Sequence, residues 1–307
     1  MDFSLFLIQT LNGLQLGVLL FLLASGLTLI FGIMDLVNLA HGSLYMIGAF
    51  FAAWLTIVLE SFVAGVLLAL PLTALFAWVL EIAIVRRLYA RDHPDHILAT
   101  FGLILCLDTL VHMVFGPEGY SVPLPSWLDG RIPLPGDGVF PTYRLVIILA
   151  GLLIAMGLYW LINHTRMGMR IRAGAANGVM AAALGIDIRQ LFMAVFVLGS
   201  VLAGFAGMLI APINDASIGM GNDIIITAFV VVIIGGLGSM KGAFVAAILI
   251  GLIDTLGRSF LDDSLKLIMD ATTAETAAPA ISSMLIYILM AVILALRPQG
   301  LFPPVAR

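Results

Sequence analysis

Charged side chains and cysteine are both scarce in this sequence. Only 10% of the 307 residues are charged, whereas a soluble domain of this size carries about a quarter. The one cysteine, Cys106, lies within an apolar run, so the chain offers neither a disulfide framework of its own nor a cysteine metal cluster. With a net charge of −4, it also lacks the basic surface that a nucleic acid needs. These shortages exclude a soluble, a disulfide-rich and a nucleic-acid-binding protein.

Hydrophobic residues make up 62% of the chain instead. Apolar runs of about 17–25 residues are typical of transmembrane helices. We therefore predict an all-α, polytopic membrane helix bundle of about eight to ten transmembrane helices, forming a single domain over residues 1–307. The segment 32–41 could be re-entrant. The expected spans are 3–31, 42–59, 62–85, 97–115, 143–162, 190–211, 222–238, 242–259 and 281–296.

The basic residues favour one orientation of this bundle. Cytosolic loops of membrane proteins carry an excess of Lys and Arg. If the loop over 85–96 is cytosolic, ten of the 14 Lys and Arg residues lie inside and the other four lie outside. We therefore expect the N-terminus outside and the C-terminus inside.

The segment Thr165–Ile186 is too polar to cross a bilayer and too rich in alanine for an idle loop. Asn177 can cap a helix, Gly178–Leu184 can form two short turns with a small-residue face, and Gly185 can end them. Such a helix on the cytosolic side suits docking to a soluble partner. A charged loop that lies on the lipid surface and only follows the positive-inside rule is the alternative.

Polar residues within or beside the spans are a second set of candidates, because a carboxylate at mid-membrane costs about 2.5–3.5 kcal/mol. Asp108 and His112 are four residues apart on one helix face and could form a proton relay or tie their helix to a neighbour. No spacing typical of a metal site surrounds His41, and we predict no metal site. The candidate translocation path comprises Asn12, Asn38, His41, Asp108 and His112.

Four stretches, in this order along the chain, carry a resemblance to a known family. They are Gly26–Phe50, with its N-x-A-H-G element at 38–42, the run 166–209, the run 230–255 and the sequence RPQGLF at 297–302. Together they resemble the permease subunits of branched-chain amino acid ABC importers, specifically the shorter of the two paired permease types.

This resemblance implies a set of partners and a location. Such a permease forms half of a translocation path with a second permease subunit, and it works with two cytosolic ABC ATPases and an extracytoplasmic substrate-binding protein. The expected location is the bacterial cytoplasmic (inner) membrane, as a multi-pass protein within the lipid bilayer. The resemblance implies no cofactor on this chain and no enzyme activity of its own, because the partner subunits use the ATP.

The resemblance also assigns the cytosolic segment near 173–185 as the coupling helix that contacts the ATPases. Small side chains there permit close docking, and Arg170 and Arg172 could pair with acidic residues of an ATPase. The implied coupling residues are Arg170, Arg172, Ala173, Ala176, Asn177, Ala181, Ala182 and Gly185.

Two other classes compete with this interpretation. A gradient-driven secondary amino acid transporter would use Asp108 and His112 as a proton site and would need no ATPase. A membrane-embedded enzyme would require a nucleophile and a base, or a metal constellation, and the sequence shows none. Dependence of uptake on a cytosolic ATPase distinguishes the importer from the gradient-driven transporter.

Overall fold

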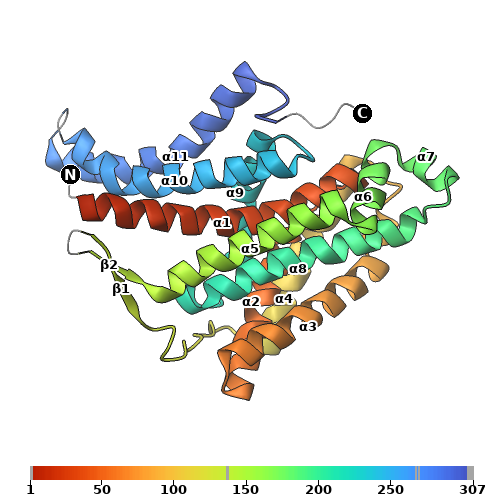
Figure 1. Cartoon of the computed structure of the whole chain (residues 1–307), viewed down its shortest axis with the longest axis horizontal. Helices are drawn as coiled ribbons and strands as arrows, with labels where there is room; N and C mark the ends of the chain where they lie inside the picture. Colours follow the sequence, from red (N-terminus) through yellow and green to blue (C-terminus); the bar gives the residue numbers. More distant parts are fainter. Residues whose placement is uncertain (1–2, 136–137, 267, 269, 303–307) are drawn as a thin grey trace.

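The computed structural model describes residues 3–135, 138–266, 268 and 270–302, and helices dominate it (Figure 1). One short antiparallel hairpin pairs β1 (Arg131–Pro133) with β2 (Val139–Pro141). The helices are α1 (Phe3–Met34), α2 (His41–Leu59), α3 (Phe62–Ala83), the 3-10 turn η1 (Val85–Arg87), α4 (His93–Phe115), α5 (Thr142–His164), α6 (Arg166–Ala176), α7 (Gly178–Ala183), α8 (Ile188–Asn214), α9 (Met220–Gly235), α10 (Met240–Leu265) and α11 (Ala271–Leu296).

Every predicted span coincides with a helix, which confirms the all-α polytopic bundle. Within the described residues, seven helices are long and apolar enough to cross a membrane, and α11 adds an eighth if its two parts, bent by 48°, form one span. The span expected at 222–238 is wrong in its length, because α9 ends at Gly235 after 16 residues. Such a helix is about 24 Å long, shorter than the hydrocarbon core of about 30 Å.

Long helices lie side by side along the bundle (Figure 1). The helix α1 begins at one end, here called the outer end, and α6 and α7 lie at the opposite, inner end. The helices α1, α2 and α8 form the buried centre, and glycines allow their backbones to approach closely. A Cβ atom at Gly48 of α2 would overlap the backbone of Gly204 in α8.

Two irregular segments turn back into the bundle from opposite ends. The inner re-entrant segment (35–40) follows α1, and its Leu36 and Asn38 are buried. It delivers the start of α2 beside the middle of α1, where His41 Nε2 lies 3.2 Å from the carbonyl oxygen of Leu23. Irregular backbone at membrane depth is tolerated where protein surrounds it.

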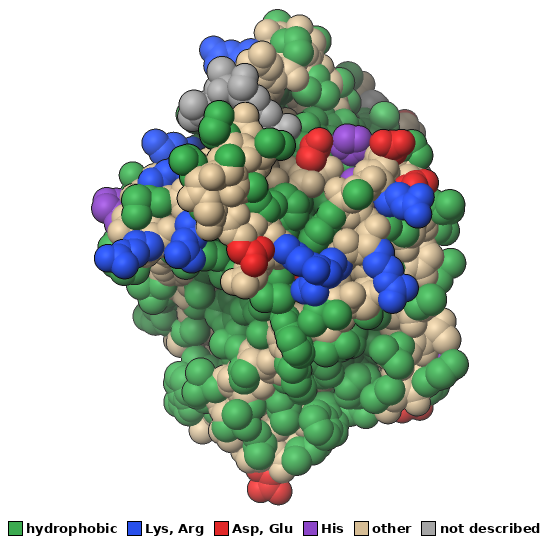
Figure 2. Space-filling model, turned by 90° about the vertical axis from the view of Figure 1, so that its right-hand side faces the viewer, with side chains coloured by type: hydrophobic (Ala, Val, Ile, Leu, Met, Phe, Trp, Pro, Cys, Tyr) green, Lys and Arg blue, Asp and Glu red, His purple; other side chains and the backbone are tan. Residues whose placement is uncertain are grey.

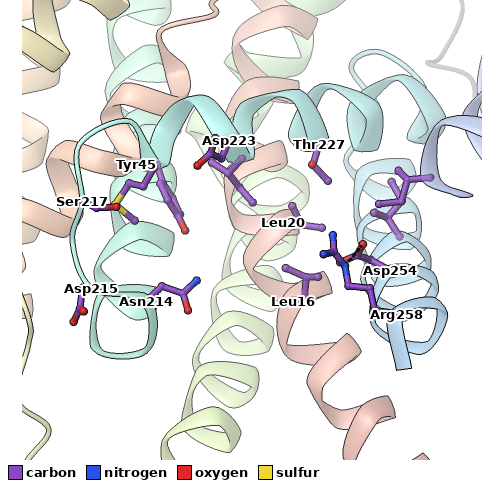
Figure 3. Close-up of a pocket in the computed structure, with 14 residues that line it drawn as sticks. Leu16, Leu20, Tyr45, Asn214, Asp215, Ser217, Asp223, Thr227, Asp254 and Arg258 are labelled. Atoms are coloured by element: carbon purple, nitrogen blue, oxygen red, sulfur yellow. Dashed lines mark hydrogen bonds and ion pairs between the residues drawn. The ribbon is translucent and has the colours of Figure 1, made fainter. Parts of the chain in front are cut away.

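The outer re-entrant segment (215–219) follows α8 in the same manner. Ala216 pairs with Tyr120 of an outer loop, and the chain then returns to the start of α9, which crosses α1 at a steep angle (Figure 3). At the start of α9, a Cβ atom on Gly221 would overlap the backbone of Gly42 in α2. The first turns of α2 and α9 therefore meet inside the bundle.

Candidate functional site

A helical projection at the inner end occupies the place of the expected coupling segment. Asn177 separates α6 from α7: its backbone is extended, with φ −160° and ψ 99°, and its side-chain oxygen accepts a hydrogen bond of 2.9 Å from Met180 N. Gly185, with φ 88°, ends the turn, and its N–H donates to Ala182 O at 2.9 Å. The segment near 173–185 is thus the end of α6, a break and α7.

The projection displays larger apolar side chains than the sequence suggested. Ala181 is buried, whereas Ala182 is exposed. The side chains of Val179 and Leu184 are 85% and 79% exposed, and Met180 is exposed beside them. A cluster of exposed apolar side chains is typical of surfaces that contact a protein or a membrane. Sequence reasoning overlooked them because it considered the alanines alone.

The two arginines assigned to coupling differ in their surroundings. Both Arg170 and Arg172 are exposed, but Arg172 donates a hydrogen bond to Ile162 O at the end of α5. Arg172 therefore helps to hold α6 against α5, while Arg170 presents its charge to solvent. Ala173 and Ala176 lie on the same helix, half-buried and exposed respectively.

Cations gather around this projection. Figure 2 looks at the inner end and shows a band of Lys and Arg side chains across it, with an apolar surface below. The exposed arginines at this end include Arg87, Arg91, Arg166, Arg170, Arg172 and Arg189. The band follows the positive-inside rule and offers positive charge to an acidic partner.

A buried carboxylate anchors part of this basic end. Glu81 of α3 is fully buried and accepts hydrogen bonds from Arg86 at 2.7 and 3.1 Å and from the Tyr89 hydroxyl at 2.5 Å. Burial and the bond to Glu81 raise the pKa of Tyr89. The Tyr89 ring also packs edge-on against Phe192 of α8. The cluster ties α3, η1 and α8 together below the surface of the inner end.

Two of the expected path residues lie on the peripheral helix α4. Asp108 accepts a hydrogen bond of 3.0 Å from Asn222 in the first turn of α9, and His112 is exposed. No hydrogen bond or ion pair joins Asp108 to His112 within the described chain. The carboxylate–imidazole pair that a proton relay would use is not formed, and Asp108 links α4 to α9.

The other three path candidates occupy two further places. Asn12 of α1 accepts a hydrogen bond of 2.6 Å from Arg144 of α5. Asn38 lies in the inner re-entrant segment, and His41 begins α2. Asn38 Oδ1 and His41 Nδ1 are both buried and lack hydrogen-bond partners within the described residues. The five candidates therefore do not form one cluster. Within the described ranges, no group of three His, Cys, Asp or Glu side chains suited to a metal occurs, at His41 or elsewhere.

A polar pocket near the outer end was missed by sequence reasoning. It has a volume of about 380 Å³ and lies between α1, α2, α9, α10, α11 and the outer re-entrant segment. Figure 3 shows Tyr45 and Asp223 on one side and the ion pair Asp254–Arg258 on the other. No sequence pattern groups these residues, because only the crossing of α9 brings them together.

A bundle of membrane-crossing helices, with a basic projection at one end and a polar pocket near the other, defines a multi-pass membrane permease. Residues 9–294 match the family model described as the permease component of branched-chain amino acid transport systems. The chain belongs to this family.

The relatives agree with this assignment. The chain is 27% identical to LivH of Escherichia coli, a high-affinity branched-chain amino acid transport system permease protein, over 86% of this chain and 90% of LivH. It is 29% identical to BraD of Pseudomonas aeruginosa, over 85% and 89%. Its match to LivM of Escherichia coli, at 25% identity, covers only 67% of LivM, so the chain is of the shorter permease type. No solved structure matches it.

Proposed function

We propose that this chain is the membrane permease subunit of an ATP-driven ABC importer for branched-chain or similar amino acids. It forms half of the translocation path beside a second, related permease in the bacterial cytoplasmic membrane. Two cytosolic ABC ATPases bind and hydrolyse the ATP, and an extracytoplasmic binding protein supplies the substrate. In support, the relatives are named as permease proteins of branched-chain amino acid transport systems, and this chain is similar to both LivH and LivM.

The observation that carries the proposal is the projection made by α6 and α7. A short helix with three exposed apolar side chains, set among exposed arginines, suits a groove on a soluble partner. The cap at Asn177 fixes the start of α7, and Ala181 is buried on its inner face. Movement of an ATPase bound to α7 would pass through this rigid connection to α6 and α8.

The substitution Ala182→Trp tests the coupling. Ala182 is exposed, so the larger side chain obstructs docking without disturbing the core. We expect ATP-driven uptake of leucine into proteoliposomes of the whole transporter to fall by about tenfold or more, because an obstructed docking surface loses at least about 1.4 kcal/mol. ATP hydrolysis persists, and the melting temperature of the permease does not change.

The matched control is Ala90→Trp, an exposed alanine in the connection between η1 and α4 at the same end. This variant keeps normal uptake. Unchanged uptake in Ala182→Trp would contradict the proposed coupling surface. Uptake that proceeds without ATPase subunits and follows an imposed proton gradient would instead establish the gradient-driven transporter.

A further inference from the structure

The outer pocket combines positive charge, negative charge and aliphatic wall in one cavity. The Asp254–Arg258 pair stands on α10, Asp223 stands on α9, and leucine and isoleucine side chains lie between and around them (Figure 3). Pockets that bind small molecules are mostly apolar with a few convergent polar groups, and their volumes begin near 300 Å³. The pocket of about 380 Å³ falls in this size range, and its lining is more polar, with several charged side chains beside the aliphatic ones.

Arg258 is held in place yet keeps most of its donors. Its Nε donates a hydrogen bond of 2.9 Å to Asp254 Oδ1, one helical turn away. The Asp254 side chain is 13% exposed and that of Arg258 is 60% exposed, so the carboxylate positions the guanidinium at the cavity. Since a guanidinium has five N–H donors in a planar fork, its terminal amino groups remain available for a carboxylate ligand.

Two carboxylates of the pocket have no partner among the described residues. Asp223 and Asp215 have no hydrogen bond or ion pair within the described part of the chain, although both line the cavity. Asp223 lies in the first turn of α9, where the helix dipole favours a negative charge. It lines the cavity on the side away from Arg258 (Figure 3), so an ammonium group on a ligand would give this carboxylate a partner.

The wall between the charges is aliphatic. Leu16 and Leu20 come from the middle of α1, Ile250 from α10 and Ile286 from α11, with Ile224 on α9 beside Asp223. Tyr45 is the aromatic member of the lining. This wall suits a branched hydrocarbon side chain better than a polar one.

We propose that the outer pocket binds the amino acid substrate as a zwitterion. Asp223 receives the ammonium group, the terminal amino groups of Arg258 receive the carboxylate, and the aliphatic wall receives the side chain. The permease thereby selects its substrate a second time, after the binding protein. This inference rests on the proposed function and extends it to substrate recognition within the membrane.

A thiol-protection experiment tests the site without requiring transport. The chain contains one cysteine, Cys106, so Cys106→Ser provides a cysteine-free background for Thr227→Cys in the pocket lining. In membranes that carry the whole transporter, a water-soluble maleimide added from the outer side labels the new thiol. We expect L-leucine to slow the labelling about tenfold. Leucine amide, which lacks the carboxylate, and 4-methylpentanoate, which lacks the ammonium group, give little protection, because each loses one of the two charge-assisted contacts of the proposed site.

Charge-removing variants connect the two residues to the protection. In the Thr227→Cys background, Asp223→Asn and Arg258→Gln each raise the leucine concentration that gives half-maximal protection about tenfold, the loss of one charge-assisted contact. The matched controls are Asp262→Asn at the end of α10 and Arg131→Gln on β1, which lie outside the pocket lining and keep full protection. Ser126→Cys, exposed on the outer loop, labels equally with and without leucine.

Two results would overturn the zwitterion site. One is a pocket thiol that does not react from the outer side, and the other is equal protection by leucine, leucine amide and 4-methylpentanoate. Either result, together with intact ATP-dependent uptake by the unsubstituted transporter, rejects the site and leaves the proposed function standing. Loss of ATP dependence in that uptake assay rejects the proposed function separately.

Discussion

Two groups of helices in this molecule are similarly apolar but face different surroundings. In α1, α2 and α8, between 67% and 83% of the most apolar stretch is buried within the chain, whereas the values for α3, α4 and α5 are 22% to 28%. We call the first group the central helices and the second the peripheral helices. The peripheral helices turn large side chains such as Leu98, Leu153 and Trp160 outward, as lipid-facing helices do.

The difference does not come from hydropathy, which is similar in both groups; it follows the places where small residues let helices pack closely. A Cβ atom at Gly26, Gly48 or Gly207 of the central helices would overlap the backbone of a neighbouring helix. At Gly102 and Gly157 of the peripheral helices it would meet nothing within 4 Å, whereas at Gly65 and Gly151, where α3 and α5 contact α2 and α1, it would again overlap a neighbour. Because lipid chains are as apolar as leucine, close backbone packing holds the centre together.

The largest effect is expected from Gly48→Leu. The new side chain would force α2 away from Gly204 of α8, and a backbone cannot yield as a flexible side chain does. Overpacking of this kind costs about 3 kcal/mol or more, so we expect no monodisperse protein after detergent extraction. The control Gly157→Leu adds the same atoms to the exposed side of α5 and purifies normally. A well-folded Gly48→Leu variant would contradict the division into central and peripheral helices.

An intermediate effect is expected from truncating a leucine in each group. Leu22 of α1 is fully buried, while Leu105 of α4 is 56% exposed. Leu22→Ala leaves a cavity and lowers the free energy of unfolding by about 2 kcal/mol or more, whereas Leu105→Ala changes it by less than about 0.5 kcal/mol. Thermal unfolding in detergent measures both. Equal losses in the two variants would mean that α4 is as tightly packed as α1.

The smallest effect concerns the one fully buried carboxylate of a peripheral helix. Tyr89→Phe removes the hydroxyl donor to Glu81 and costs about 1 kcal/mol, because Arg86 still balances the charge. The pKa of Tyr89 is raised in the folded state, so its contribution to the free energy of unfolding is complete below the ordinary tyrosine pKa of about 10. Above that pH the tyrosine of the unfolded chain ionises first, and the contribution declines.

Unfolding measured across alkaline pH checks this sign. The unsubstituted protein loses more stability above about pH 10 than Tyr89→Phe does. A steeper alkaline loss in the variant would show that another group governs the response.

The sequence predicted the membrane helices well because each depends on a local apolar run. It misjudged α9, since the run 222–238 continues through Gly236, whose φ of 102° ends the helix. In the coupling segment, local capping at Asn177 and Gly185 was readable, because a cap involves residues only a few positions apart.

Contacts between distant residues were not readable in this way. The sequence suggested His112, four residues away, as the partner of Asp108. In the structure Asp108 is bonded to Asn222, which is 114 residues away. The outer pocket was missed for the same reason. Asp223 and Arg258 stand on two helices whose relative placement depends on the re-entrant segment before α9. Single-sequence patterns report helix faces, but not which faces meet.

The meeting of α2 and α9 at Gly42 and Gly221 also constrains how the chain enters the membrane during synthesis. The helix α9 has 16 residues and follows irregular backbone. It would insert poorly on its own, because the unpaired peptide groups of that preceding segment would face hydrocarbon. Its place exists only after α1 and α2 are in the bilayer, because Gly42 lies where α9 begins. We therefore expect α9 to pack against α1 and α2 after they have inserted, and α10 to pack against α9 afterwards. Biogenesis of this permease would then be sequential, and a truncated chain ending at Gly235 would be a target for membrane proteases.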